Sequence, residues 1–357
     1  MTPTIRVLVV DDSAFNRRTI IKMLEAVPGI EVVGYACDGE EGLRKVFDLH
    51  PDLITLDLEM PRMDGFTFLR IVMAGRPTPV IVISARSEDE NVFRALDFGA
   101  VDFVAKPSAR ISPELFNIRE DLVRKVLSGG RTDMSKVLQR SSQIEAVAPR
   151  IPVARKGGGE QPPHVKQATA LVVIGASTGG PPALQTIFSA IREPLPVAFA
   201  IAQHMPPGFT RAFAERMNKL SALTIAEAVD GDLVLPGKVF IAPGGKNLVF
   251  ERTGQEVRIK VVNPAPEQRY VPSVDVLFTS AAAAFAARTV AVVLTGMGND
   301  GHQGVMAIKK AGGGVIAESE ESSVVFGMPK EAIATGCVDT VVPLALVCGE
   351  IIRKCGL

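Results

Sequence analysis

Short runs of aliphatic residues alternate with amphipathic segments along the first third of the chain. Between two such runs, Ile20, Leu24 and Val27 fall on one face of a helical pattern. This alternation predicts a parallel sheet with helices on both faces. The expected strands are Ile5–Val10, Val32–Ala36, Leu53–Asp57, Val80–Ser84 and Asp102–Ala105, and a helix over Glu114–Leu127 closes the series.

The pattern then stops and later resumes. Residues 128–169 lack sustained periodicity and are rich in Gly, Pro and Ser clusters, which predicts a linker that is mostly extended or disordered. We therefore expect two doubly wound α/β domains, residues 1–127 and 170–357, on either side of that linker. In the second domain the expected strands are Ala170–Ile174, Val197–Ala202, Val239–Ala242 and Val290–Leu294, and the expected helices are Pro182–Ala190, Gly208–Ser221, Val274–Ala287 and Gly301–Ala311, with a hairpin over Leu248–Val262 and a closing helix that carries Leu344, Val347, Ile351 and Cys355.

The charge balance, the length of the apolar runs and the cysteine spacing of the chain each argue against a class of function. Lys and Arg together number 39, equal to the 39 Asp and Glu, so net charge does not point to nucleic acid or an anionic membrane. No apolar run is long enough to insert into a bilayer, and no secretory signal pattern opens the sequence, so we expect a cytoplasmic protein. The four cysteines form no C-x-x-C pair, which argues against zinc and fits reduced thiols.

A first candidate site follows from polar residues at the strand ends of the first domain. Asp11 and Asp12 follow the first strand, Asp57 ends the third, Ser84 ends the fourth, and Lys106 follows the fifth. Parallel strands bring their carboxyl ends to one edge, where three carboxylates would repel each other unless a hard cation such as Mg²⁺ neutralised them. A carboxylate here could accept a phosphoryl group, with the hydroxyl and the lysine binding it. Ordinary strand-end capping is the alternative.

These residues sit in recognisable motifs: DDS at Asp11–Ser13, LDLEMPRMDG at Leu56–Gly65 and KP at Lys106–Pro107. Residues 1–127 thereby resemble a response-regulator receiver domain, which has a flavodoxin-like fold. The resemblance implies Mg²⁺-dependent phosphorylation at Asp57, with Asp11, Asp12 and Asp57 holding the metal. It also implies a switch that couples Ser84 to Phe103, the aromatic residue before Lys106.

A second candidate site is built around Ser177, in the run LVVIGASTGG. An apolar strand ends in glycine, the serine follows on a turn of small residues, and Pro181 and Pro182 suit a helix start. The string GASTG fits the G-x-S-x-G nucleophile pattern, which points to acyl transfer. A glycine-rich turn with an incidental serine is the alternative.

A nucleophilic serine needs a base and a group that orients the base. His204 and Asp300 both follow predicted strands and would reach the same sheet edge as Ser177. The competing α/β-hydrolase order requires His302 as base with an earlier acid, Asp230 or Asp275. A phosphate cradle is a weaker alternative, because the loop has no lysine.

The glycines on either side of Met297 would let backbone N–H groups approach an oxyanion. Thr178 either aligns the base or caps the following helix.

Four motifs in this domain carry a second resemblance: IGASTGGP, QHMPPGFT, APGG and LTGMGNDG, beginning at Ile174, Gln203, Ala242 and Leu294. They resemble the Rossmann-like catalytic domain of the chemotaxis protein-glutamate methylesterase and glutamine deamidase family, whose order of receiver, linker and esterase matches the whole chain. The resemblance implies that Ser177 is the nucleophile, His204 the base and acid, and Asp300 the orienting group, with backbone near Met297 in the oxyanion hole.

The family's substrate is a glutamate γ-methyl ester on a methyl-accepting chemoreceptor, and methanol is released. Many members also deamidate receptor glutamines. The resemblance further implies a chemotaxis histidine kinase as phosphodonor and no cofactor for ester hydrolysis. We hypothesise that the unphosphorylated receiver limits access to the active site. A binding module with an inactive triad, and an esterase or amidase acting on another protein, remain the alternatives.

Overall fold

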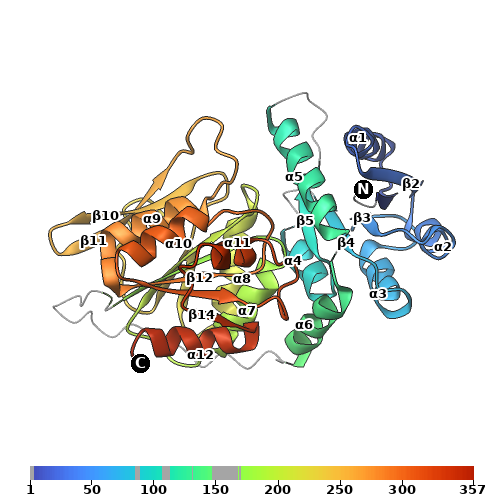
Figure 1. The fold of residues 1–357 in the computed structure, drawn as a ribbon. Coiled ribbons are helices and arrows are strands. Elements are labelled where there is room, and N and C mark those ends of the chain that lie inside the picture. The colour runs from blue at the N-terminus through green and yellow to red at the C-terminus, as the bar shows by residue number, and fades with distance from the viewer. Residues whose placement is uncertain (1–3, 85–88, 107–112, 131, 147–167, 169) are drawn as a thin grey trace. The chain divides into compact units, whose positions relative to one another are not determined.

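The computed structural model describes residues 4–84, 89–106, 113–130, 132–146, 168 and 170–357. The chain divides into two compact units, Met1–Glu145 and Ala146–Leu357 (Figure 1). Among the described residues, no helix combines the length and the apolar character that crossing a membrane requires.

The first unit contains a five-stranded parallel sheet in the order β2-β1-β3-β4-β5. This is the flavodoxin-like order. The sheet therefore confirms the predicted fold of the first domain, and the order reverses between β1 and β3. Its elements are β1 (Ile5–Val10), α1 (Ala14–Glu25), β2 (Ile30–Ala36), α2 (Gly39–Leu49), β3 (Leu53–Asp57), α3 (Gly65–Gly75), β4 (Val80–Ser84), α4 (Asp89–Asp97), β5 (Asp102–Ala105) and α5 (Pro113–Gly129).

Helices cover both faces of this sheet because its strands are apolar on both sides. On one face, Ile20 and Leu24 of α1 pack with Leu122 and Val126 of α5 in a core that includes Val7 of β1. The residues that cap α1 and α2, Ser13 and Asp38, lie just after the ends of β1 and β2. Ser13, for example, accepts a hydrogen bond from Asn16 N at 3.3 Å and so begins α1 beside the strand-end aspartates.

The predicted linker is wrong over part of its length. Residues Met134–Ala146 form a helix, α6, and residues up to Glu145 belong to the first compact unit. Val137 is buried, and a Cβ built on Gly99 would lie 3.7 Å from Leu138 Cδ2, so α6 packs against the receiver. Most of the predicted linker, residues 147–167 and 169, lies outside the described residues. The domain limits 1–127 and 170–357 otherwise stay a prediction.

The second unit contains a seven-stranded parallel sheet in the order β14-β13-β12-β6-β7-β9-β8, which confirms a second doubly wound domain. Four elements had not been predicted: β8, β13, α11 and β14. The elements are β6 (Leu171–Ala176), α7 (Gly180–Ala190), β7 (Ala198–Gln203), α8 (Phe209–Leu220), β8 (Thr224–Glu227), β9 (Lys238–Ile241), β10 (Asn247–Thr253), β11 (Glu256–Val262), α9 (Val274–Phe285), the 3-10 helix Ala286–Arg288, β12 (Thr289–Val293), α10 (His302–Lys310), β13 (Gly314–Glu318), α11 (Met328–Ala334), β14 (Thr340–Val342) and α12 (Leu344–Lys354).

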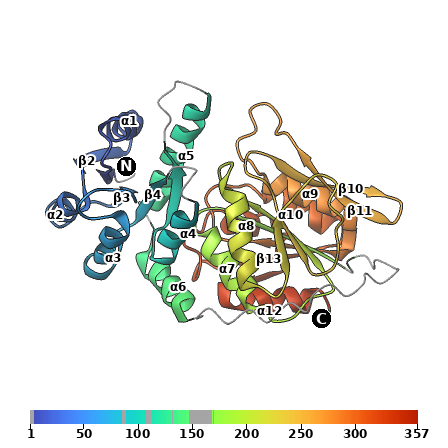
Figure 2. The ribbon, with the colours of Figure 1, turned by 180° about the vertical axis from the view of Figure 1, so that it is seen from behind.

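Helices lie on both faces of this sheet as well. Helices α9 and α10 lie in front of the strands in Figure 1, and α7 and α8 lie in front of them when the molecule is seen from behind in Figure 2. The antiparallel pair β10–β11 forms the predicted hairpin, with Thr253 opposite Glu256 at its tip. The central strands β6, β7 and β12 are fully buried, so they hold their carboxyl ends in fixed positions.

Candidate functional site

Three adjacent strands of the second sheet deliver the three predicted catalytic residues. Strand β6 lies between β12 and β7, and Ser177 follows β6 directly. His204 follows β7, and Asp300 lies on the loop after β12. Hydrogen bonds extend the sheet past the strand ends, from His204 N to Ala176 O at 3.0 Å and from Ser177 N to Thr295 O at 3.0 Å. The serine therefore lies at the middle strand, with the histidine and aspartate strands on either side.

The turn around Ser177 depends on small residues. Gly179 adopts φ +75°, a left-handed conformation that favours glycine, and Gly180 N donates to Ser177 O at 2.8 Å as α7 begins. A Cβ on Gly296 would lie 2.7 Å from Ser177 Cβ, so the loop after β12 packs directly against the serine. The sharp strand-to-helix turn predicted from the sequence is confirmed.

His204 and Asp300 form a buried hydrogen-bonded pair. His204 Nε2 lies 2.8 Å from Asp300 Oδ2, and both residues are less than a tenth exposed. An aspartate oxygen only accepts, so in the neutral imidazole Nε2 carries the proton and Nδ1 has the lone pair. His204 Nδ1 is buried and has no hydrogen-bond partner among the described residues. It is the nitrogen that remains to act as a base, which reverses the two nitrogens' roles in the chymotrypsin-type triad.

The N-terminus of helix α9 holds the Asp300 carboxylate in place. Oδ2 accepts from Val274 N at 2.7 Å, and Oδ1 accepts from Asp275 N at 2.9 Å and from Ser273 Oγ at 3.0 Å. Burial by itself would raise the pKa of Asp300. The hydrogen bond from His204, the positive charge of that ring when it is protonated, and these backbone N–H groups outweigh burial and lower the pKa below its ordinary value. The carboxylate is therefore ionised and fully bonded, as an orienting group needs to be.

The competing α/β-hydrolase arrangement does not form. Asp275 Oδ1 accepts from the backbone N–H groups of Gly301 and Gly304, at 3.0 and 2.7 Å, and so caps helix α10. His302 Nδ1 lies 3.2 Å from the Glu331 carbonyl oxygen instead of facing an acid. Burial raises the pKa of Asp275, although the backbone N–H groups oppose the rise. Asp275 and Asp300 thus cap each other's helices, and only Asp300 reaches a histidine.

The glycine loop after β12 presents the expected backbone donors near the serine. Among the described residues, neither Met297 N nor Gly298 N donates a hydrogen bond within the protein. Thr178 is buried beside Ser177, and its carbonyl accepts from Thr295 Oγ1 at 3.0 Å. The roles of Met297 in an oxyanion hole and of Thr178 in aligning the base stay predictions.

Sequence reasoning missed two residues that organise this site. Gln203 is buried, and its Nε2 donates to Ser177 O at 3.0 Å and to His204 O at 3.2 Å, so one amide ties the two loops together. Tyr270 stacks on the His204 ring. Gln203 stands in the quoted motif QHMPPGFT, whereas Tyr270 carries no motif that would have marked it.

In the first unit, the predicted phosphoacceptor cluster comes together at the switch point of the sheet. Carboxylate oxygens of Asp11, Asp12 and Asp57 all lie within 4.8 Å of one another. Lys106 Nζ pairs with Asp57 Oδ1 at 2.9 Å. Asp57 is fully buried, as is Ser84 at the end of the neighbouring strand β4. The three carboxylates and Lys106 therefore come together, and Ser84 ends the strand next to that of Asp57.

The chemistry of this cluster fits a hard cation. Burial, followed by the charge of Asp57, raises the pKa of Asp11 to about 7, and burial raises the pKa of Asp57 against the opposing effect of Lys106. One oxygen of each, Oδ2, is buried without a hydrogen-bond partner among the described residues. Crowded carboxylates with unpartnered oxygens are the donor set that Mg²⁺ prefers.

The predicted switch aromatic, Phe103, is buried in strand β5. Its ring meets that of Phe93 edge to face, with centroids 6.2 Å apart. Its carbonyl accepts from the buried Lys125 Nζ at 2.6 Å. The aromatic side chain therefore occupies an inward position, one strand away from Ser84.

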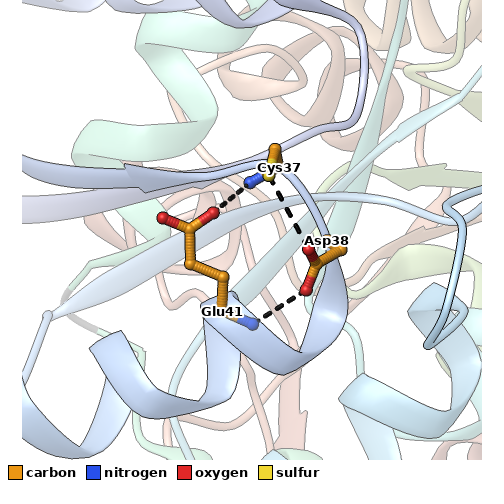
Figure 3. Close-up of side chains that lie close together, drawn as sticks. All are labelled: Cys37, Asp38 and Glu41. Carbon is orange, nitrogen blue, oxygen red and sulfur yellow. Dashed lines mark hydrogen bonds between the residues drawn. The ribbon is translucent and has the colours of Figure 1, made fainter.

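A second group with metal-ligand chemistry, Cys37, Asp38 and Glu41, has a structural explanation (Figure 3). Asp38 Oδ1 accepts from Glu41 N at 2.9 Å, and Glu41 Oε2 accepts from Cys37 N at 2.8 Å, a reciprocal arrangement close to a capping box. The other oxygens bond to Arg62 and Lys45. Since every carboxylate oxygen has a partner, this group begins helix α2, and the protein does not need a metal there.

The fold and the two sites define a response regulator whose output domain is built like a serine hydrolase. The family model for the CheB methylesterase matches residues 172–351, and that for the response regulator receiver domain matches residues 7–113. The chain belongs to the CheB methylesterase family.

Full-length relatives agree with this assignment. The chain is 57% identical to protein-glutamate methylesterase/protein-glutamine glutaminase 3 of Geobacter sulfurreducens, over 99% of this chain and 98% of the relative. It is 48% identical to protein-glutamate methylesterase/protein-glutamine glutaminase 1 of Myxococcus xanthus, over 95% and 94%. Among solved structures, the CheB methylesterase catalytic domain of Thermotoga maritima is similar with a TM-score of 0.50 and 41% identity, covering 52% of this chain and 97% of that domain.

Proposed function

We propose that this chain is a phosphorylation-activated serine esterase that hydrolyses glutamate γ-methyl esters on methyl-accepting chemoreceptors in the cytoplasm, during chemotaxis adaptation. The observation that carries the proposal is the His204–Asp300 hydrogen bond, formed from the two strands that flank the Ser177 strand. The names of the full-length relatives support the same activity.

The proposed reaction proceeds through an acyl-enzyme. Ser177 Oγ attacks the ester carbonyl carbon while His204 Nδ1 takes its proton, and Asp300 stabilises the imidazolium that forms. The carbon–oxygen bond to the methoxy group breaks, and methanol leaves with the proton from His204. Water, deprotonated by the same nitrogen, then hydrolyses the acyl-enzyme to free glutamate and Ser177. In this state the Ser177 hydroxyl and His204 are not hydrogen-bonded among the described residues, and substrate binding commonly tightens such contacts.

Backbone donors stabilise the tetrahedral intermediate in this proposal. The N–H groups of Met297 and Gly298 have no partner within the described protein and belong to the loop that packs on Ser177. Such donors act where negative charge develops. We assign Thr178, buried beside Ser177, to aligning the base His204.

The same residues suit amide hydrolysis. The relatives' names pair the esterase with a protein-glutamine glutaminase, and a γ-amide differs from a γ-methyl ester only in its leaving group. We propose that Ser177 also attacks receptor glutamines, with His204 protonating the departing ammonia. Loss of ammonia release in the same Ser177 variant that loses methanol release would support one site for both reactions.

Phosphorylation of Asp57, with a chemotaxis histidine kinase as donor, is the proposed control of this site. Asp11, Asp12 and Asp57 would hold Mg²⁺, which neutralises charge as the phosphoryl group transfers. Lys106 binds the phosphoryl group as a point charge, and Ser84 donates its hydroxyl to it. Movement of Ser84 then couples to Phe103.

Phosphodonor-dependent methanol release tests the proposed function. With methylated receptor, Mg²⁺ and a small acyl phosphate, the full chain is expected to release methanol at least about fivefold faster than without the phosphodonor, a modest coupling between sites. Asp57→Asn should keep the basal rate and lose the increase. Asp52→Asn is the matched control: Asp52 lies just before the same strand, β3, and its carboxylate accepts only from Arg6 N among its described partners. An increase that survives Asp57→Asn, or no methanol release at all, would contradict the proposal.

Magnesium binding is expected to require the phosphoacceptor cluster alone. Calorimetric titration of the full chain should give one Mg²⁺ site whose affinity falls at least about tenfold in Asp11→Asn, because one of three carboxylate ligands is replaced by a weaker amide. Glu41→Gln, in the carboxylate group at the start of α2, should bind as the unmodified chain does. The reverse pattern would place the metal at Cys37, Asp38 and Glu41.

A further inference from the structure

Tyr270 stacks face to face on the predicted catalytic base. The Tyr270 and His204 rings have centroids 5.1 Å apart and are inclined by only 7°. The residue lies on the loop between strand β11 and helix α9, more than sixty positions from His204 in the chain. The stack is therefore made by the fold and not by local sequence.

The other end of the tyrosine reaches the glycine loop that faces Ser177. A Cβ built on Gly298 would lie 2.3 Å from Tyr270 Oη, and Gly298 has φ +89°. No residue with a side chain fits there without displacing the phenol. The half-buried Tyr270 ring therefore contacts both the His204 imidazole and the loop of Met297 and Gly298, which carries the proposed oxyanion donors.

The backbone on both sides of Tyr270 is anchored to strand β10. Gln268 Nε2 donates to Tyr270 O at 2.7 Å, and the Gln268 amide exchanges two hydrogen bonds with that of Asn247, at 2.9 and 3.1 Å. The buried Asn247 Oδ1 also accepts from Ser273 N at 3.0 Å. Since Ser273 Oγ donates to Asp300, the same anchored segment contacts both members of the His–Asp pair.

We propose that Tyr270 is a positioning residue for His204 in ester hydrolysis, an inference that rests on the triad of the proposed function. Among the described residues the His204 ring has one hydrogen bond, at Nε2, and one hydrogen bond alone does not fix the plane of the ring. The stacked phenol fixes that plane and therefore the direction of Nδ1. As the serine proton transfers, the imidazole becomes a flat cation against an aromatic face, so the contact strengthens in the transition state.

The expected effect falls on kcat and not on KM. Tyr270→Leu should lower kcat for methanol release from methylated receptor by about 10-fold, the rate equivalent of a half-buried cation–π contact, with KM within about twofold. Tyr270→Phe keeps the ring and should stay within about threefold of the unmodified chain. Labelling of Ser177 by a fluorophosphonate, which needs the base but no receptor, should slow in the same proportion in the leucine variant. Tyr270→Gln repeats the test with a polar side chain should the leucine variant aggregate.

Tyr35→Leu is the matched control, because Tyr35 is the other tyrosine of the chain and lies on strand β2 of the receiver. It should leave basal kcat and Ser177 labelling unchanged. The inference is overturned by a leucine variant with unchanged kcat, by a change in KM alone, or by a phenylalanine variant as slow as the leucine variant. An unmodified chain that neither releases methanol nor labels at Ser177 overturns the proposed function itself, whereas an active chain that is indifferent to Tyr270 overturns only this inference.

Discussion

Replacing Ser177 with alanine is expected to lower methanol release by about a millionfold, to the level that binding and backbone donors alone sustain. The substitution removes the proposed nucleophilic hydroxyl, on the turn after β6 between the strands of His204 and Asp300. Its Cβ remains, so contact with Gly296 and the start of α7 are kept. Methanol release from methylated receptor, followed over long incubation with concentrated enzyme, measures the loss.

Two further measurements make this result specific. A fluorophosphonate should label the unmodified chain at Ser177 and leave the alanine variant unlabelled, while Asp57 still accepts phosphate in both. Ser189→Ala is the matched control, since the Ser189 hydroxyl only bonds to the Thr186 carbonyl within helix α7. A Ser177→Ala chain with more than about a thousandth of the original activity would exclude a serine nucleophile and favour a binding or scaffold role for this domain.

The positions of the chemical groups followed from the sequence because parallel strands obey a simple rule. Ser177, His204 and Asp300 each lie after a buried apolar run, and the carboxyl ends of such strands share one sheet edge. The same rule places Asp57 and Ser84. Glycines at tight turns, such as Gly179, added the local geometry. To apply this rule one must know only that the strands are parallel, and the alternation of strands with helices predicts that.

Two of the missed strands, β8 and β14, and the missed helix α6 have weak local signals. Strand β8 lies at the sheet edge and buries chiefly Ile225, and β14 has three residues. Helix α6 is rich in Ser and Gln, so its apolar residues, among them Val137, did not stand out. Tertiary packing on the receiver stabilises α6, and the local sequence pattern does not predict tertiary contacts.

The fine structure of the site could not be predicted for a related reason. The positions of His204 and Asp300 after predicted strands indicate that the two side chains meet. Which ring nitrogen faces the carboxylate depends on side-chain torsions, which the sequence pattern does not determine. Tyr270 contacts His204 from a segment that Gln268 anchors to Asn247, at the open end of the β10–β11 hairpin. Hydrogen bonds between distant loops leave no periodicity in the chain.

Replacing Asp300 with asparagine should lower kcat by about ten-thousand-fold while KM stays within a few-fold. The Asp300 oxygens accept from four donors: His204 Nε2, Ser273 Oγ, Val274 N and Asp275 N. An amide has one accepting oxygen, so its NH₂ group must face some of these donors. If it faces His204, the ring proton moves to Nδ1 and the base is lost; if it faces helix α9, the carboxylate charge is still missing when the imidazolium forms.

Asp339→Asn separates this effect from general destabilisation. The Asp339 carboxylate accepts from Val315 N at 2.8 Å and pairs with Lys309 and Lys354 at the opposite edge of the same sheet. Both variants should lose about 1–3 kcal/mol in the free energy of unfolding, because each leaves buried or paired donors less well satisfied. Only Asp300→Asn should lose turnover. An Asp300→Asn chain that keeps a tenth of kcat would mean that His204 takes the serine proton without an orienting carboxylate. The hydrogen bond from His204 Nε2 to Asp300, which leaves Nδ1 as the base, would then have no part in catalysis.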